Sequence, residues 1–218
     1  MHINFFIFDW SGTLSDDRNP VYKANLQMEK DFGIDRDLSM DEWLRGITMS
    51  VSEGFKKLGV TASPDEIDRV YKKRFNEAIQ EGGPIPYKDT KEVLQFLKQK
   101  GKRIGVVSAH PQLNLEREAK EYDVFELFDF VQGDARNKQS DLERLRDELR
   151  LDPETTIYTG DTTHDIRATK EAGLISGGIS TGYHARENLE AAEPDYLFDS
   201  LSEIMGYLSS KKPSISEQ

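Results

Sequence analysis

The sequence predicts an α/β protein: a Rossmann-like, doubly wound parallel sheet with an all-helical domain inserted after its first strand. Two observations lead to this fold class. Short apolar segments alternate with helical patterns along most of the chain, which is typical of a parallel sheet with crossover helices. A single stretch near the N-terminus, residues 15–83, interrupts the alternation with helical patterns alone.

Six segments are expected to form strands. The first, Ile3–Phe8, is an apolar run interrupted only by Asn4, and buried strands of parallel sheets are usually apolar. The other five are Arg103–Ser108, Phe128–Gln132, Thr156–Gly160, Leu174–Ile179 and Tyr196–Phe198. The helices expected around them are Thr90–Lys100, Leu113–Tyr122, Ser140–Leu149, Asp165–Ala172 and Leu201–Leu208. Because parallel neighbours need a crossover connection, this alternation favours one parallel sheet.

The interrupting stretch contains four helical patterns, which are Val21–Phe32, Met40–Thr48, Val51–Leu58 and Pro64–Gln80. Ser63 is a suitable N-cap for the last of them, and Pro64 suits a first helical turn. Residues 81–86, which are rich in glycine and proline, then lead back to the sheet. We therefore predict two domains: an α/β core of residues 1–14 and 84–218, and a helical domain of residues 15–83.

The composition argues against several classes of function. The chain has 218 residues and a formal net charge of −11, which disfavours binding to nucleic acid or to an anionic membrane. It contains no cysteine, so disulfides, thiolate metal sites and a cysteine nucleophile are excluded. The sequence has no signal-peptide pattern and no apolar run of membrane-spanning length. We expect a soluble cytoplasmic protein, and the sequence leaves a homodimer open.

Polar residues stand at the carboxyl ends of the predicted strands. Three carboxylates, Asp9, Asp161 and Asp165, would meet at one sheet edge, where like charges raise each other's pKa unless a cation lies among them. Carboxylate oxygens are the ligands that Mg²⁺ prefers. Ser108 adds a hydroxyl, Lys138 a positive charge, and a helix after Ser108 would offer N–H groups to an anion. The pattern predicts a site for a phosphate group beside a metal ion and a carboxylate nucleophile.

Four motifs in this order resemble those of the haloacid dehalogenase-like (HAD) hydrolase superfamily. They are Asp9-Trp10-Ser11-Gly12-Thr13, Ser108 after an apolar strand, Lys138, and Gly160-Asp161 with Asp165. The inserted helices are similar to a C1-type cap domain, and the chain looks most like the phosphoglycolate phosphatase and phosphonatase-like subgroup. The resemblance implies a cap that closes over the site, excludes water and selects the substrate.

The resemblance also implies a role for each motif residue. Asp9 would attack phosphorus and form an aspartyl-phosphate, with Ser108 and Lys138 as its catalytic partners. The substrate-binding residues would be Trp10, Ser11, Ser108, Ala109 and Lys138. The Mg²⁺ ligands would be Asp9, Asp161 and the backbone carbonyl of Ser11, and Asp165 would support the metal site directly, through water or through Lys138. The expected function is Mg²⁺-dependent hydrolysis of a small phosphorylated metabolite.

Ser11 departs from the family pattern. Phosphatases of this family carry a second aspartate there, which protonates the leaving oxygen and then activates water, and a serine hydroxyl lacks a suitable pKa for this. Three explanations remain open. The leaving group needs little protonation, as in an acyl or aryl phosphate. Another residue, such as His110, His164 or a residue of the cap, replaces the acid. Otherwise the substrate is not a phosphate ester.

The last explanation has a specific form, a phosphonoacetaldehyde hydrolase. These enzymes resemble Asp-Trp-Ala-Gly-Thr at the first motif and use a cap lysine as a Schiff base, for which Lys56 and Lys57 are the candidates here. A hypothesis from another class is a weakly active phosphate-binding or regulatory module that keeps the scaffold without the acid. Turnover of substrates with good leaving groups would distinguish an enzyme from such a module.

Overall fold

A computed structural model describes residues 2–47 and 51–209 of the chain. The chain divides into two compact units, one of Met1–Ser15 with Pro86–Gln218 and the other of Asp16–Ile85. The first unit is α/β and the second is helical. Among the described residues, no helix has the length and apolar character needed to cross a bilayer.

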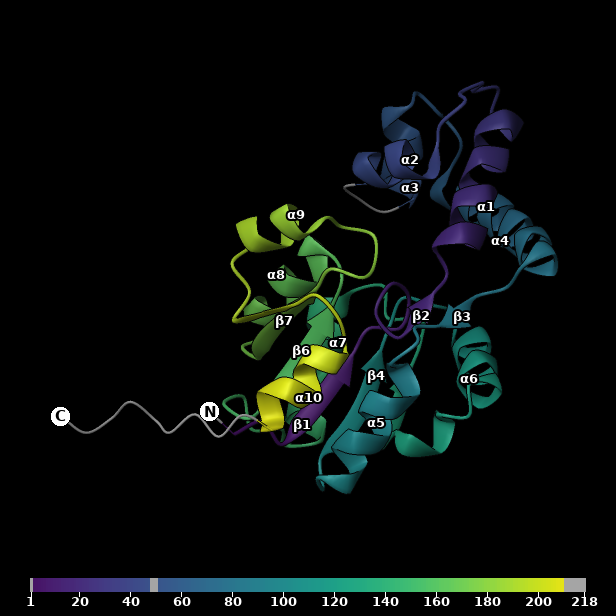
Figure 1. Ribbon diagram of the computed structural model, residues 1–218. Helices are drawn as coiled ribbons and strands as arrows, with labels where there is room; N and C mark the ends of the chain where they lie inside the picture. Colours follow the sequence, from purple (N-terminus) through teal and green to yellow (C-terminus); the bar gives the residue numbers. More distant parts are fainter. Residues whose placement is uncertain (1, 48–50, 210–218) are drawn as a thin grey trace. The chain divides into compact units, whose positions relative to one another are not determined.

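A six-stranded sheet forms the centre of the α/β unit (Figure 1). Its strands stand in the order β5-β4-β1-β6-β7-β8, and each neighbouring pair is parallel. Their bounds are Phe130–Gln132, Arg103–Val107, Phe5–Phe8, Thr156–Gly160, Ile175–Ile179 and Tyr196–Phe198, in that order across the sheet. This confirms the predicted fold class. It also places β1 at the centre, where the order of the strands along the chain reverses.

The apolar residues of β1 serve both faces of the sheet because successive side chains of a strand alternate. Phe6 and Phe8 belong to the core beneath α5 (Thr90–Gln99), α6 (Gln112–Glu121) and α10 (Ser202–Ser209). Phe5 and Ile7 belong to the core on the other face, together with residues of α7 (Lys138–Glu148) and of the chain just after α8 (Thr163–Glu171). A buried strand with helices on both sides explains the apolar run that predicts it.

The helical unit contains α1 (Arg18–Asp31), α2 (Met40–Gly46), α3 (Val51–Lys57) and α4 (Pro64–Glu81). Ser63 caps α4 by accepting a hydrogen bond from the Glu66 N–H, and Pro64 occupies the first turn, as predicted. Met28, Phe55 and Ile67 form the buried core of this unit. All four predicted helices are observed, although Thr48, the predicted end of the second, lies outside the described residues.

The expectation of no strand within residues 15–83 is wrong at its first residues. Ser15–Asp16 forms β2, which pairs with β3 (Ile85–Pro86) where the chain passes between the two units. Two-residue strands are too short for a hydrophobic period to reveal them. A 3₁₀ turn, Phe125–Leu127, and the six-residue helix α9, Arg186–Ala191, were likewise not predicted.

Candidate active site

Asp9 follows β1 directly, at the point where the chain's path through the sheet reverses. The strands on either side of β1 are β4 and β6, and their carboxyl ends carry Ser108 and Asp161. Open α/β sheets bind ligands at such switch points, because the helices depart to opposite faces and leave a crevice. The predicted convergence of these residues at one edge of the sheet is observed.

Lys138 joins two of the carboxylates. Its Nζ donates a hydrogen bond to Asp9 Oδ2 at 2.9 Å and a second to Asp165 Oδ1. The lysine is the first residue of α7, which Asn137 caps by accepting a hydrogen bond from the Ser140 N–H, so the helix fixes where the ammonium lies. The two buried carboxylates hold the pKa of Lys138 well above its usual value despite the desolvation that lowers it.

Asp165 has a second function at the start of α8. Its Oδ2 accepts hydrogen bonds from the Thr162 N–H at 3.0 Å and the Thr162 hydroxyl at 2.5 Å, and Thr162 in turn accepts from the Asp165 N–H. This capping box satisfies helix-terminal donors and fixes the carboxylate at the same time. Burial raises the pKa of Asp165, but its attraction to Lys138 and the hydrogen bonds from Lys138 and Thr162 prevail and lower it.

Asp161 is fully buried and held by backbone and hydroxyl groups. Its Oδ2 accepts from the Tyr183 N–H at 2.7 Å, and its Oδ1 accepts from the Thr13 hydroxyl at 3.3 Å. Glycine is needed beside it, because a Cβ on Gly12 or Gly182 would lie 2.3 or 2.0 Å from Asp161 Oδ2. Gly12 also has a φ of +73°, which side chains rarely adopt.

The acidic cluster has the properties of a divalent-cation site. Carboxylate oxygens of Asp9, Asp161 and Asp165 lie within 4.8 Å of one another, and all three residues are buried. Burial and the charges of Asp165 and Asp9 raise the pKa of Asp161 well above its usual value, and burial also raises that of Asp9. One lysine cannot offset three buried carboxylates, whereas a hard divalent ion with oxygen ligands can. The donor set fits Mg²⁺.

Three of the predicted phosphate-binding residues, Trp10, Ser108 and Lys138, form hydrogen bonds with Asp9. The Trp10 N–H donates to Asp9 Oδ1 at 2.7 Å, and a hydrogen bond from the buried Ser108 side chain offsets part of the rise in the Asp9 pKa that burial causes. Ser108 Oγ also accepts from the His110 N–H at 3.2 Å. Ala109, between them, is exposed. The Trp10 ring is fully buried and stacks on Tyr122 with ring centroids 5.5 Å apart.

Ser11 has a neighbour that its sequence position does not reveal. Its Oγ lies 3.4 Å from His110 Nδ1, and His110 Nε2 lies 3.1 Å from Glu118 Oε1. His110 is therefore brought to the site, as one of the predicted alternatives requires. His164 is exposed, although it lies between two residues of the cluster in sequence. Lys56 and Lys57 are exposed at the end of α3 in the helical unit.

Glu118, Gly182 and Tyr183 were not predicted as residues of the site, and Thr13 was predicted only as part of the first motif, without its contact to Asp161. A signal for Glu118 does exist, because it lies on the face of α6 that buries Leu115 and Ala119, and a buried acid on an apolar face needs partners. No comparable signal marks Tyr183, which binds Asp161 through its backbone N–H, a group that every non-proline residue carries.

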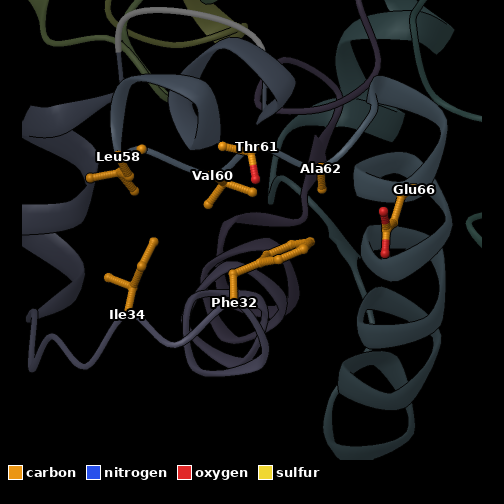
Figure 2. Close-up of a pocket in the computed structure, with 8 residues that line it drawn as sticks. Phe32, Ile34, Leu58, Val60, Thr61, Ala62 and Glu66 are labelled. Carbon is orange, nitrogen blue, oxygen red and sulfur yellow. The ribbon is translucent and has the colours of Figure 1, made fainter.

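A separate pocket lies within the helical unit (Figure 2). It has a volume of about 440 Å³, and its lining residues are Phe32, Ile34, Leu58, Gly59, Val60, Thr61, Ala62 and Glu66. The charged side chain in this lining, Glu66, is acidic, so the pocket is unsuited to phosphate. The three carboxylates of the acidic cluster, Asp9, Asp161 and Asp165, all belong to the other unit.

Known proteins are similar to this chain over nearly its whole length. Pyrophosphatase PpaX of Bacillus mycoides is 28% identical over 214 residues, which cover 96% of this chain and 98% of the relative. A protein of Dickeya dadantii named "Probable phosphatase IndB" is 30% identical over 215 residues, covering 92% and 91%. The crystal structure of a predicted phosphatase from Clostridium acetobutylicum has the same fold, with a TM-score of 0.81 at 18% identity over 95% of this chain and 99% of that one.

The family model described as haloacid dehalogenase-like hydrolase matches residues 6–179, which include all four motifs. This match confirms the resemblance drawn from the motifs, and the chain belongs to the haloacid dehalogenase-like hydrolase family.

Proposed function

We propose that the protein is a Mg²⁺-dependent phosphatase that hydrolyses a small phosphorylated metabolite through an aspartyl-phosphate on Asp9. One observation carries the proposal: Asp9, at the switch point of the sheet, lies 2.9 Å from the Lys138 ammonium within a buried cluster of three carboxylates. The names of two relatives, a pyrophosphatase and a phosphatase, favour the same chemistry.

The proposed reaction has two displacements at phosphorus. In the first, an Asp9 carboxylate oxygen bonds to phosphorus, and the leaving oxygen departs with the electron pair of its bond. In the second, water bonds to phosphorus and the Asp9 oxygen leaves as a carboxylate. Lys138 offsets negative charge on the phosphoryl oxygens, Ser108 donates a hydrogen bond to them, and Asp165 keeps Lys138 in place. Bound Mg²⁺, held by Asp9, Asp161, Asp165 and the Ser11 carbonyl, would supply further charge stabilisation.

The helical unit, Asp16–Ile85, would act as the cap. It is inserted immediately after the loop that carries Asp9, and the chain returns through β3, which pairs with β2 at the end of that loop. A cap of this kind excludes water and selects the substrate by its own side chains.

The test is phosphate release from a panel of acyl phosphates, aryl phosphates, inorganic pyrophosphate and sugar phosphates, with phosphonoacetaldehyde included. Each is assayed with Mg²⁺ and with EDTA, for the unaltered chain and for Asp9→Asn. Asp37→Asn, an exposed aspartate of the helical unit, is the matched control. Release that needs metal, persists in the control and is lost in Asp9→Asn is the expected result.

Two other outcomes identify the alternatives. Release from phosphonoacetaldehyde alone would indicate cleavage of a carbon–phosphorus bond and would move attention to Lys56 and Lys57. Tight phosphate binding without turnover of any member, even an acyl phosphate, would indicate a binding module.

A further inference from the structure

Four side chains form a hydrogen-bonded chain that begins at Ser11, the position where the family carries its second aspartate. Ser11 Oγ lies 3.4 Å from His110 Nδ1, His110 Nε2 lies 3.1 Å from Glu118 Oε1, and the Trp10 indole N–H donates to Glu118 Oε2 at 2.8 Å. Glu118 is 2% exposed and His110 is 8% exposed. The chain links the Asp9 loop, the residues after β4, and α6.

The partners of Glu118 determine which way the hydrogen bonds run. A carboxylate only accepts, and the indole N–H of Trp10, which can only donate, occupies one of its oxygens. The other oxygen therefore accepts the proton of His110 Nε2, and in the neutral imidazole this tautomer leaves a lone pair on Nδ1. Nδ1 then accepts the hydroxyl proton of Ser11, and the lone pairs of Ser11 Oγ remain as acceptors.

We propose that Ser11, oriented by His110 and Glu118, takes over one of the two tasks of the missing aspartate. A hydroxyl oxygen whose proton is held by Nδ1 accepts a hydrogen bond from water, so it orients the water that attacks the phosphorylated Asp9. It has no proton to give to a leaving oxygen. His110 and Glu118 are thus positioning residues, and the substrates are phosphates with weakly basic leaving oxygens, the class of phosphoanhydrides, acyl phosphates and aryl phosphates.

This inference rests on the proposed function. Neither of its two displacements needs a further acid or base. In the first displacement, the phosphorus–oxygen bond of the substrate breaks and its oxygen departs as an anion. In the second, the water oxygen bonds to phosphorus while the bond to Asp9 breaks. Both hydrogens of the water leave with the phosphate, one of them having pointed at Ser11 Oγ during the attack.

The two displacements can be measured separately with an aryl phosphate and Mg²⁺. Rapid mixing gives the rate of the first displacement as a burst of the phenolate, and steady-state turnover gives the second when it is slower. We expect His110→Ala to leave the burst rate unchanged, to lower steady-state turnover by about 10²-fold, and to accumulate aspartyl-phosphate. Glu118→Gln should act in the same direction, and His2→Ala, a histidine exposed at the N-terminus, is the matched control.

Two further variants make the test independent of any folding defect. Ser11→Ala, at a half-buried position in the loop, should accumulate aspartyl-phosphate as His110→Ala does. Ser11→Asp supplies its own carboxylate, so adding it to His110→Ala should restore turnover and remove the accumulation, which a merely structural defect would not allow.

The inference is overturned if His110→Ala and Ser11→Ala lower burst and turnover equally, if they change neither, or if Ser11→Asp fails to restore the double variant. Failure of the proposed function looks different. In that case the unaltered chain itself releases neither phenolate nor phosphate with Mg²⁺, and the inference falls with it.

Discussion

Lys138 Nζ and Asp9 Oδ2 lie 2.9 Å apart, although 129 positions separate the two residues in sequence. Both side chains are less than a tenth exposed. A buried lysine of this kind must be paired, because an isolated ammonium in the interior costs several kcal/mol. Its second partner, Asp165, lies at the start of a different helix, so Lys138 ties β1, α7 and α8 together at the site.

The first prediction concerns removal of this lysine. Lys138→Ala leaves buried carboxylates without their cation, so we expect the metal-free protein to lose about 3–5 kcal/mol of unfolding free energy. Phosphate release should fall by about 10²–10³-fold, because the ammonium no longer stabilises charge on the phosphoryl group. Denaturant titration and the phosphate assay check the two effects.

The control for this prediction is Lys91→Ala, which breaks the exposed pair between Lys91 and Asp123. Such pairs contribute roughly 0–1 kcal/mol, so its stability and activity should stay close to those of the unaltered chain. Equal losses in the two lysine variants would contradict the account.

The second prediction concerns the glycines beside Asp161. A Cβ at Gly12 would lie 2.3 Å from Asp161 Oδ2, so Gly12→Ala should displace that carboxylate and abolish stabilisation by Mg²⁺. Gly101 has a similar φ, +69°, but nothing lies within 4 Å of its would-be Cβ. Gly101→Ala should therefore cost only the left-handed backbone strain, roughly 1–2 kcal/mol, and keep the response to Mg²⁺. Thermal unfolding with and without Mg²⁺ compares them, and an intact response in Gly12→Ala would refute the steric argument.

The third prediction concerns Asp161 and metal. Burial and its acidic neighbours raise the Asp161 pKa, so in the metal-free fold its charged form is unfavourable. With EDTA at neutral pH, Asp161→Asn should be more stable than the unaltered chain. Mg²⁺ should stabilise the unaltered chain, by about 2.7 kcal/mol at a hundred times its dissociation constant, and leave the variant unchanged.

The pH dependence of the unfolding free energy follows from the rise in the Asp161 pKa. Between the ordinary Asp pKa of 3.8 and the raised value, the folded protein binds more protons at Asp161 than the unfolded chain does. Stability from this group is therefore present below pH 3.8 and lost as the pH rises through the raised pKa. In EDTA, the gain in unfolding free energy from Asp161→Asn should grow as the pH rises through this window, and it should vanish near pH 3.8. An advantage that is constant with pH would exclude a titrating Asp161 as its cause.

The fourth prediction concerns Ser11→Asp. A carboxylic acid at this position can protonate a leaving oxygen, which matters most when that oxygen is strongly basic. We expect the variant to raise activity on alkyl phosphates more than on aryl phosphates, measured as the ratio of kcat/KM for the two classes. Equal gains, or losses on both, would mean that the missing acid does not limit the enzyme.

Much of the fold is predictable from the sequence because the signals are local. Phe5–Phe8, the observed part of the predicted strand Ile3–Phe8, is apolar throughout, as a strand covered on both faces usually is. Thr156–Gly160 and Tyr196–Phe198 are observed with the predicted bounds. Predicted helices end within a few residues of the observed ones, and α7 begins at Lys138 rather than Ser140 because Asn137 supplies the cap. The short strands β2 and β3 escape prediction, since two residues define no period.

The candidate site is predictable where its residues follow strands, and not where contacts arise between distant elements. Asp9, Ser108 and Asp161 each stand at a strand end, so topology brings them together. The link from Ser11 through His110 to Glu118 depends on how α6 packs against the Asp9 loop. The spacing of these residues along the chain does not indicate how α6 packs.

The most direct test of the central claim is chemical trapping of the intermediate on Asp9. The protein is mixed with Mg²⁺ and an acyl or aryl phosphate, quenched in acid and treated with borohydride, and the peptide that contains Asp9 is then analysed by mass spectrometry. We predict that Asp9 is converted to homoserine, in a reaction that EDTA prevents. Phosphate release with Asp9 unmodified at every time of quenching, or modification of another residue instead, would contradict the account.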